Sequence, residues 1–173
     1  MQSRARAPRY YFDWKEAKTW ADKGMKPFTT AVSVAFALQE GIRMIEEEGL
    51  AKVYERHARL ARATQAGLQA LGFTLFARDG YRSNTVTAAL PPDGLNVEAF
   101  RKLLHDRYGV VIAGGQNKMA GKMVRVGHLG AVGEGDIVQV LWAMEQALEE
   151  MDIAPADGRG VAAVTNSLQG VPA

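Results

Sequence analysis

The segment from Tyr108 to Gly130 reads YGVVIAGGQNKMAGKMVRVGHLG, and it decides the predicted fold. We expect a buried strand over residues 110–113, a loop rich in glycine and lysine, and a second strand over residues 123–127. Side chains alternate between the two faces of a strand, so Arg125 points away from the valines on either side of it. If those valines cover a core, the Arg125 guanidinium lies on the opposite face, where its planar fork suits a carboxylate or a phosphate. An arginine on a solvated sheet face or in a surface ion pair fits the same pattern.

Outward from this segment, capping residues and hydrophobic spacing predict three helices followed by two strand–strand–helix units. This order favours an α+β fold, in which a small, mostly antiparallel four-stranded sheet is covered by helices and preceded by long helices. The predicted helices run from Asp13 to Gly24, over residues 31–48 and 50–71, from Asn96 to Gly109 and from Ile137 to Met151, and the two remaining strands cover residues 73–77 and 85–90.

The predicted domain organisation has four parts. Residues 1–9 form a flexible lead-in, and residues 10–49 form helices whose partner is absent from this sequence. Residues 50–151 form the small α+β domain. Residues 152–173 are rich in Gly, Ala and Pro and contain few large apolar side chains, so we expect a disordered tail.

The helix over residues 31–48 points to a partner surface. Its first half, AVSVAFAL, is apolar on nearly every side, which is typical of a helix that is buried from several directions. The small sheet offers too little surface to cover it. We therefore expect it to contact a large domain or a second subunit.

Composition sets limits on the class of protein. The 173 residues include 21 Lys and Arg against 19 Asp and Glu, a formal charge of +2, which does not favour nucleic acid or a membrane surface as partner. The absence of cysteine excludes disulfides and thiolate metal sites, and three scattered histidines do not favour a metal cluster. No apolar run reaches the roughly 20 residues of a membrane helix. We expect a cytoplasmic protein without a metal.

Two glycine-rich stretches do not match nucleotide-binding motifs. Residues 115–123 have five residues between the two glycines, and Met123 stands where a P-loop has the Ser or Thr that holds magnesium. Residues 127–133 lack the G-x-G opening of the dinucleotide fingerprint.

Six motifs, in this order, are similar to the C-terminal part of class V pyridoxal-phosphate aminotransferases of the alanine–glyoxylate or serine–pyruvate type. The similarity covers roughly residues 8–151. The motifs are PRYYFDW at 8–14, PFT at 27–29, EGL at 48–50, RSNTVT at 82–87, YGVVIAGG at 108–115 and GKMVRVGHLG at 121–130.

The resemblance implies a fold type I transferase that works as a homodimer with pyridoxal 5'-phosphate and small amino and 2-oxo acids. By position, Arg125 matches the arginine that binds the substrate carboxylate. Thr29 matches the threonine that reaches the cofactor phosphate of the other subunit. Lys26 stands near the same phosphate, where the family often has Tyr or Thr. His128 is expected to support the structure.

The resemblance also implies that the lysine forming the Schiff base lies upstream of this sequence, so no catalytic residue is expected here. Lys118 and Lys122 lie in the wrong place to replace it and are expected to be exposed. The chain by itself is therefore expected to be inactive. The alternative interpretation is a non-catalytic anion-binding or dimerisation module of ferredoxin-like α+β type.

Overall fold

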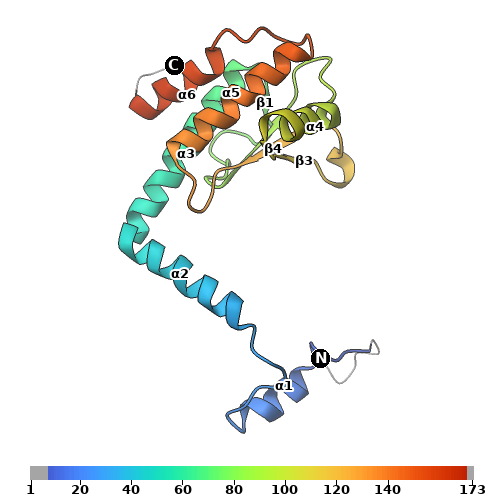
Figure 1. Ribbon diagram of the computed structural model, residues 1–173, viewed down its shortest axis with the longest axis vertical. Helices are drawn as coiled ribbons and strands as arrows, with labels where there is room; N and C mark the ends of the chain where they lie inside the picture. Colours follow the sequence, from blue (N-terminus) through green and yellow to red (C-terminus); the bar gives the residue numbers. More distant parts are fainter. Residues whose placement is uncertain (1–7, 171–173) are drawn as a thin grey trace. The chain divides into compact units, whose positions relative to one another are not determined.

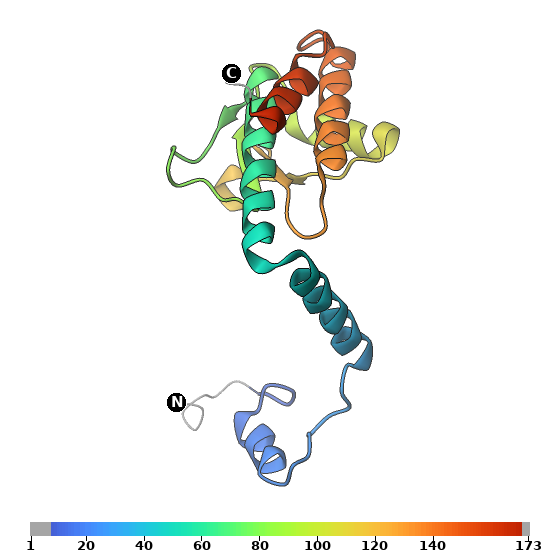
Figure 2. The same cartoon turned by 90° about the vertical axis from the view of Figure 1, so that its left-hand side faces the viewer.

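The computed structural model describes residues 8–170 and divides into two compact units, of which the first ends at Glu48 and the second begins at Gly49. The elements of each unit are shown in Figure 1 and, after a quarter turn, in Figure 2. Most of the predicted lead-in, residues 1–7, lies outside the described residues. Residues 8–170 contain no helix with the length and apolar character that a membrane span requires. They also contain no group of three or more His, Asp or Glu side chains that could hold a metal ion.

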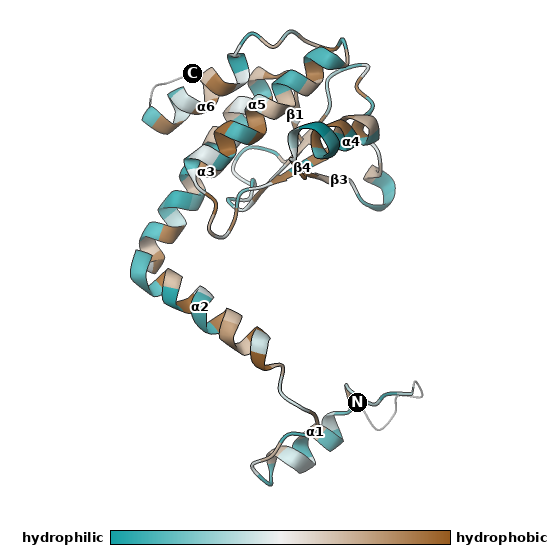
Figure 3. Ribbon diagram, in the orientation of Figure 1, coloured by the Kyte–Doolittle hydropathy of each residue, from teal (hydrophilic) through white to brown (hydrophobic). Residues whose placement is uncertain are grey.

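The first unit consists of two helices, α1 (Trp14–Ala21) and α2 (Val32–Glu48). Asp13 caps α1, because its carboxylate accepts hydrogen bonds from the backbone N–H groups of Lys15 at 2.9 Å and Glu16 at 3.2 Å. Neither helix contains a buried residue. Apolar residues occur along much of α2, as the hydropathy colours of Figure 3 show. Residues 8–48 therefore form no core of their own that could cover them.

The second unit is the α+β layer that the sequence predicts. Four strands form one sheet in the order β1-β2-β4-β3, and every neighbouring pair is antiparallel. The core lies between one face of this sheet and the helices, and its largest buried side chains include Leu60, Phe100, Leu141 and Leu148. The elements are α3 (Leu50–Ala70), β1 (Thr74–Leu75), β2 (Val86–Leu90), α4 (Val97–Tyr108), β3 (Ala113–Gly114), the 3-10 turn η2 (Asn117–Met119), β4 (Val124–Gly127), α5 (Glu134–Glu150) and α6 (Arg159–Gln169).

Helix α6 shows that the predicted disordered tail is wrong for residues 152–170. Glycines make close packing possible: a β-carbon at Gly160 would lie 2.8 Å from Cδ2 of Leu71. Val164 of α6 is fully buried, and the buried carboxylate of Glu145 faces the backbone N–H of Gly160 at 3.5 Å. This helix, which has few large apolar side chains, thus gains stability from tertiary packing and from a carboxylate at its N-terminus. Residues 171–173 of the predicted tail lie outside the described residues.

The strand predicted over residues 110–113 begins later than expected. Gly109 ends α4 in the left-handed conformation, with φ of 65°. The N–H of Val110 then bonds back to the carbonyl of Leu104 at 3.0 Å, so this residue still belongs to the helix end. Only Ala113 and Gly114 pair with β4, although Val110 and Ile112 are buried as predicted.

Candidate functional site

Arg125 lies in the middle of β4, on the sheet face opposite the core. Val124 and Val126 are buried, whereas Arg125 is half-buried, as the predicted alternation requires. Its partners in register are Ala88 on β2 and Ala113 on β3. Both neighbours are small, so they leave room for the guanidinium and for a ligand above the sheet.

The Arg125 side chain is fixed at one of its nitrogens. Its Nε donates a hydrogen bond to the carbonyl oxygen of Gly114 at 2.8 Å. Within residues 8–170, no ion pair joins the guanidinium to a carboxylate. The alternative interpretation, in which Arg125 forms a surface ion pair, is therefore not supported within these residues. The two terminal nitrogens can therefore donate in parallel to one planar anion.

An open hollow of about 470 Å³ surrounds this arginine. Three of its apolar side chains are solvent-exposed, with Val111 at 77% exposure, Leu129 at 56% and Val86 at 39%. The hollow thus combines an anion-binding group with apolar walls, an arrangement that suits a small carboxylate. Its lining residues are Val86, Arg101, Val111, Ile112, Ala113, Arg125, Gly127 and Leu129.

His128, directly after β4, is completely buried and holds the end of that strand. Its Nδ1 lies 3.1 Å from the carbonyl of Asn84 and its Nε2 lies 2.9 Å from the hydroxyl of Thr87. Because a carbonyl only accepts, Nδ1 carries the proton and Nε2 accepts from the hydroxyl. Burial lowers the pKa of His128, in keeping with this neutral form. These contacts agree with the structural role expected of this histidine.

Lys26 and Thr29 belong to the first unit, in the segment between α1 and α2. Both are exposed, and the ammonium of Lys26 donates to the hydroxyl of Thr30 at 2.8 Å. Phe28, between them, stacks on Tyr11 with ring centroids 4.8 Å apart. An ammonium group that bonds one threonine hydroxyl, with a second threonine next to it in the sequence, has the donor chemistry that a phosphate group requires. The residues present therefore fit the phosphate of the implied cofactor.

Two lysines near β4 do not resemble a reactive amine. Lys118, in the turn η2, and Lys122 are both exposed. A lysine nucleophile is normally activated by desolvation or by a neighbouring cation, and exposure provides neither.

Sequence reasoning did not single out Arg101 of α4, which also lines the hollow. Its Nε donates to the carbonyl of Ile112 at 3.0 Å, and its Nη1 pairs with Glu98 at 2.7 Å. The sequence contained only one local indication of an interaction of Arg101, namely its i, i+3 spacing from Glu98 on one helix face. The contact with residue 112 depends on how the helix packs beside the sheet, which no short motif encodes.

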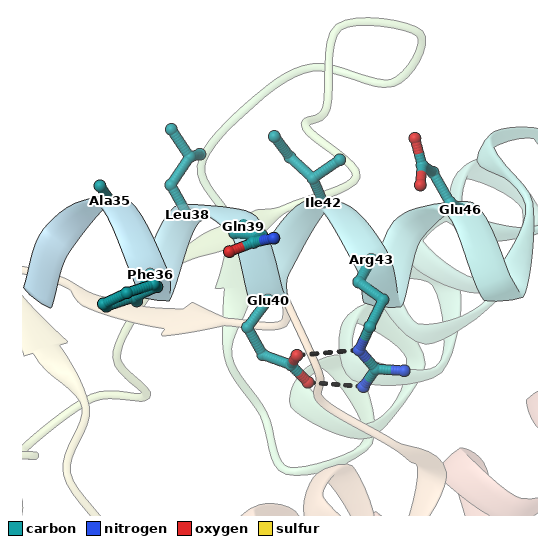
Figure 4. Close-up of a pocket in the computed structure, with 8 residues that line it drawn as sticks. All are labelled: Ala35, Phe36, Leu38, Gln39, Glu40, Ile42, Arg43 and Glu46. Atoms are coloured by element: carbon teal, nitrogen blue, oxygen red, sulfur yellow. Dashed lines mark hydrogen bonds and ion pairs between the residues drawn. The ribbon is translucent and has the colours of Figure 1, made fainter. Parts of the chain in front are cut away.

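A second recess runs along α2 (Figure 4). Ala35, Leu38 and Ile42 project from one side of the helix, while Glu40 and Arg43 form an ion pair at 2.5 Å on another side. Leu38 is 64% exposed and Ile42 is 47% exposed. All the lining residues come from this one helix, so the recess is an uncovered apolar face rather than an enclosed pocket.

Comparison with known proteins places the chain in a family. A profile described as aminotransferase class V matches residues 12–133. An uncharacterised aminotransferase of Methanocaldococcus jannaschii is 42% identical over 134 residues, which are 78% of this chain and 35% of that protein. A serine–glyoxylate aminotransferase of Methylorubrum extorquens is 33% identical over 168 residues, covering 96% of this chain and 42% of that protein.

Solved structures agree with the sequence comparison. The crystal structure of a pyridoxamine–pyruvate aminotransferase from Mesorhizobium loti matches 83% of this chain and 37% of that one, with a TM-score of 0.78 and 33% identity. The chain thus spans less than half the length of these relatives. Since the profile matches most of its length, the chain belongs to the class V aminotransferases.

Proposed function

We propose that this chain is the C-terminal segment of a pyridoxal-phosphate-dependent aminotransferase. The complete enzyme transfers an amino group between alanine or serine and glyoxylate or pyruvate. The names of two relatives, a serine–glyoxylate and a pyridoxamine–pyruvate enzyme, support acceptors of this size. Because the chain covers about two fifths of its relatives, the activity is proposed for the longer protein.

One observation carries the proposal: Arg125 presents an uncommitted pair of terminal nitrogens to an open hollow. Its Nε is already used by the carbonyl of Gly114. A substrate carboxylate is therefore bound end-on, by two parallel hydrogen bonds from Nη1 and Nη2. This geometry fixes the orientation of the carboxylate as well as its position, and so places the adjoining carbon for reaction.

The second part of the proposal concerns the cofactor. Pyridoxal 5'-phosphate supplies the electron-withdrawing ring on which amino groups are exchanged. Lys26 and Thr29 would hold its phosphate, with charge from the ammonium and a directed hydrogen bond from the hydroxyl. In the homodimer that we propose, Thr29 serves the cofactor of the other subunit, and the exposed apolar residues of α2 contribute to the contact between domains or subunits.

Substitution of Arg125 in the complete aminotransferase tests the proposal. A charge-assisted pair in a closed site contributes about 2–4 kcal/mol, so Arg125→Ala should lower kcat/KM about 30- to 1,000-fold. Arg125→Lys keeps the charge without the fork and should fall between Ala and wild type. The melting temperature and the cofactor absorbance should not change.

The competing result is equally specific. If Arg125 only holds the sheet together, both variants lose stability and cofactor while showing no preference between substrates with and without a carboxylate. A stable, cofactor-loaded Arg125→Ala enzyme with near-normal kcat/KM would remove Arg125 from the site. That outcome would assign carboxylate binding to another residue of the complete aminotransferase.

A further inference from the structure

Two backbone carbonyls, one in β3 and one just before it, point away from the neighbouring strand β4. β3 is the last strand in the sheet order, so one of its edges has no partner strand within residues 8–170. The N–H of Gly115 donates to the carbonyl of Met123 at 3.2 Å, which turns the backbone groups of residue 115 toward β4. Because these groups alternate along an antiparallel strand, residue 113 also faces β4, and Ile112 and Gly114 face the free edge.

Two arginines from different elements bond these two carbonyls. Arg101, from α4, donates its Nε to Ile112 at 3.0 Å, and Arg125, from β4, donates its Nε to Gly114 at 2.8 Å. The carbonyls are two residues apart, or about 7 Å along an extended strand. The two arginines thus each hold one carbonyl of the same short edge segment.

The Arg101 guanidinium lies directly against Gly114. A β-carbon at Gly114 would come within 2.9 Å of Nη1 of Arg101 and within 3.3 Å of Oε1 of Glu98. Glu98 pairs with that same Nη1 at 2.7 Å and so neutralises its charge and fixes its direction. Of the two guanidinium groups at this edge, Arg101 is held by a carboxylate of its own helix, and Arg125 is left for a ligand.

We propose that Arg101 is a positioning residue for Arg125. Arg101 bonds the carbonyl of Ile112 and packs on Gly114, and so fixes the backbone of this edge segment. The carbonyl of Gly114, in the same segment, then orients Nε of Arg125. The consequence for substrate binding rests on the proposed function of Arg125. The coupling between the two arginines does not rest on it and can be measured in the 173-residue chain alone.

Hydrogen exchange of the Arg125 Nε–H, followed by NMR, measures this coupling directly. The resonance is assigned by its loss in Arg125→Lys. Arg101→Met removes the hydrogen bond to Ile112 and should speed the exchange about fivefold. This is the effect expected if the loss of that bond weakens the bond between Arg125 and Gly114. Arg101→Lys retains a donor but cannot bond Ile112 and Glu98 in the same fork, and should give an intermediate rate.

Two further variants separate positioning from a general loss of stability. Gly114→Ala keeps every charge but displaces Arg101, and should speed the exchange as Arg101→Met does. Arg107→Met removes another ion pair of α4, 2.8 Å long and made with Glu150, without touching β3. It should leave the rate within about twofold of wild type. Unchanged exchange in both Arg101→Met and Gly114→Ala would overturn the proposal.

Kinetics of the complete aminotransferase distinguish failure of this inference from failure of the proposed function. Arg101→Met should raise KM for the amino acid about fivefold and leave kcat within about twofold, because it misorients a binding group. If Arg125→Ala leaves carboxylate binding intact, the proposed function fails, and the exchange rates still decide the role of Arg101. If Arg125→Ala weakens binding while Arg101→Met changes neither KM nor exchange, the positioning role is wrong.

Discussion

The substitution Gly67→Ala tests the packing of α6, the element that the sequence did not predict. A β-carbon at Gly67 would lie 2.7 Å from Cγ2 of Val164 and 2.8 Å from Cγ of Leu141. Carbon atoms in favourable contact are about 3.5–4.0 Å apart. Val164 and Leu141 are fully buried, so neither can turn into solvent. The helices must therefore separate to accept the added methyl group.

Two opposing effects determine the magnitude. Overpacking of this kind costs about 1–3 kcal/mol, and the upper part of that range applies because the overlap is with atoms of branched, buried side chains. Replacing a glycine inside a helix by alanine returns about 1 kcal/mol. We expect a net loss of about 1–2 kcal/mol in the free energy of unfolding. For a unit of this size, the melting temperature should fall by roughly 4–10 °C.

Urea and thermal unfolding, followed by circular dichroism, measure this loss. Gly135→Ala is the matched control, because nothing lies within 4 Å of a β-carbon at that helical glycine. It should leave the stability unchanged or raise it by up to about 1 kcal/mol. If Gly67→Ala stabilises the protein as much as Gly135→Ala does, α6 does not pack against α3 as described.

Three further predictions concern the chain as a whole. The isolated chain should not transaminate alanine and glyoxylate, and no single lysine should be preferred for a borohydride-stable adduct with pyridoxal phosphate, because exposed lysines such as Lys118 and Lys122 lack activation. Stoichiometric labelling of one lysine, detected by mass spectrometry, would contradict this. The isolated chain should also self-associate through the apolar face of α2, and the double substitution Leu38→Glu and Ile42→Glu should shift it toward monomer in sedimentation experiments. A monodisperse wild-type monomer at high concentration would show that this face does not mediate self-association. Burial lowers the pKa of His128 from the usual 6.5, so the unfolded chain takes up this proton first and stability should fall as the pH drops below about 6.5. His128→Gln should flatten this dependence below about pH 6.5, whereas His105→Gln, at an exposed position, should not. Equal slopes in both variants would exclude His128 as the source of the dependence.

Much of the fold could be predicted because local chemistry determines it. Asp13 and Asn96 cap helices with their side-chain oxygens, and Gly109 ends a helix in the left-handed conformation, as expected. Alternation along β4 placed Arg125 opposite the core. Each of these signals lies within a few residues of the feature that it predicts.

The features that sequence reasoning missed depend on contacts between distant residues. Helix α6 is weakly apolar by composition, and its order comes from the fit of Gly67, Gly160 and Val164 between helices. The contact of Arg101 with the edge of β3 depends on the placement of α4 beside the sheet. Shape complementarity of this kind has no period and no motif.

The central claim is that Arg125 binds the carboxylate of the substrate. Competitive inhibition of the complete aminotransferase by propionate and by its neutral amide, propionamide, tests this claim without requiring turnover of either compound. We predict that Arg125→Ala raises the inhibition constant of propionate by at least about tenfold and that of propionamide by less than about twofold. The charged carboxylate has two oxygens that accept the two parallel hydrogen bonds of the guanidinium, whereas the neutral amide has only one acceptor oxygen. Equal changes for the two inhibitors, or no change for propionate, would contradict the account.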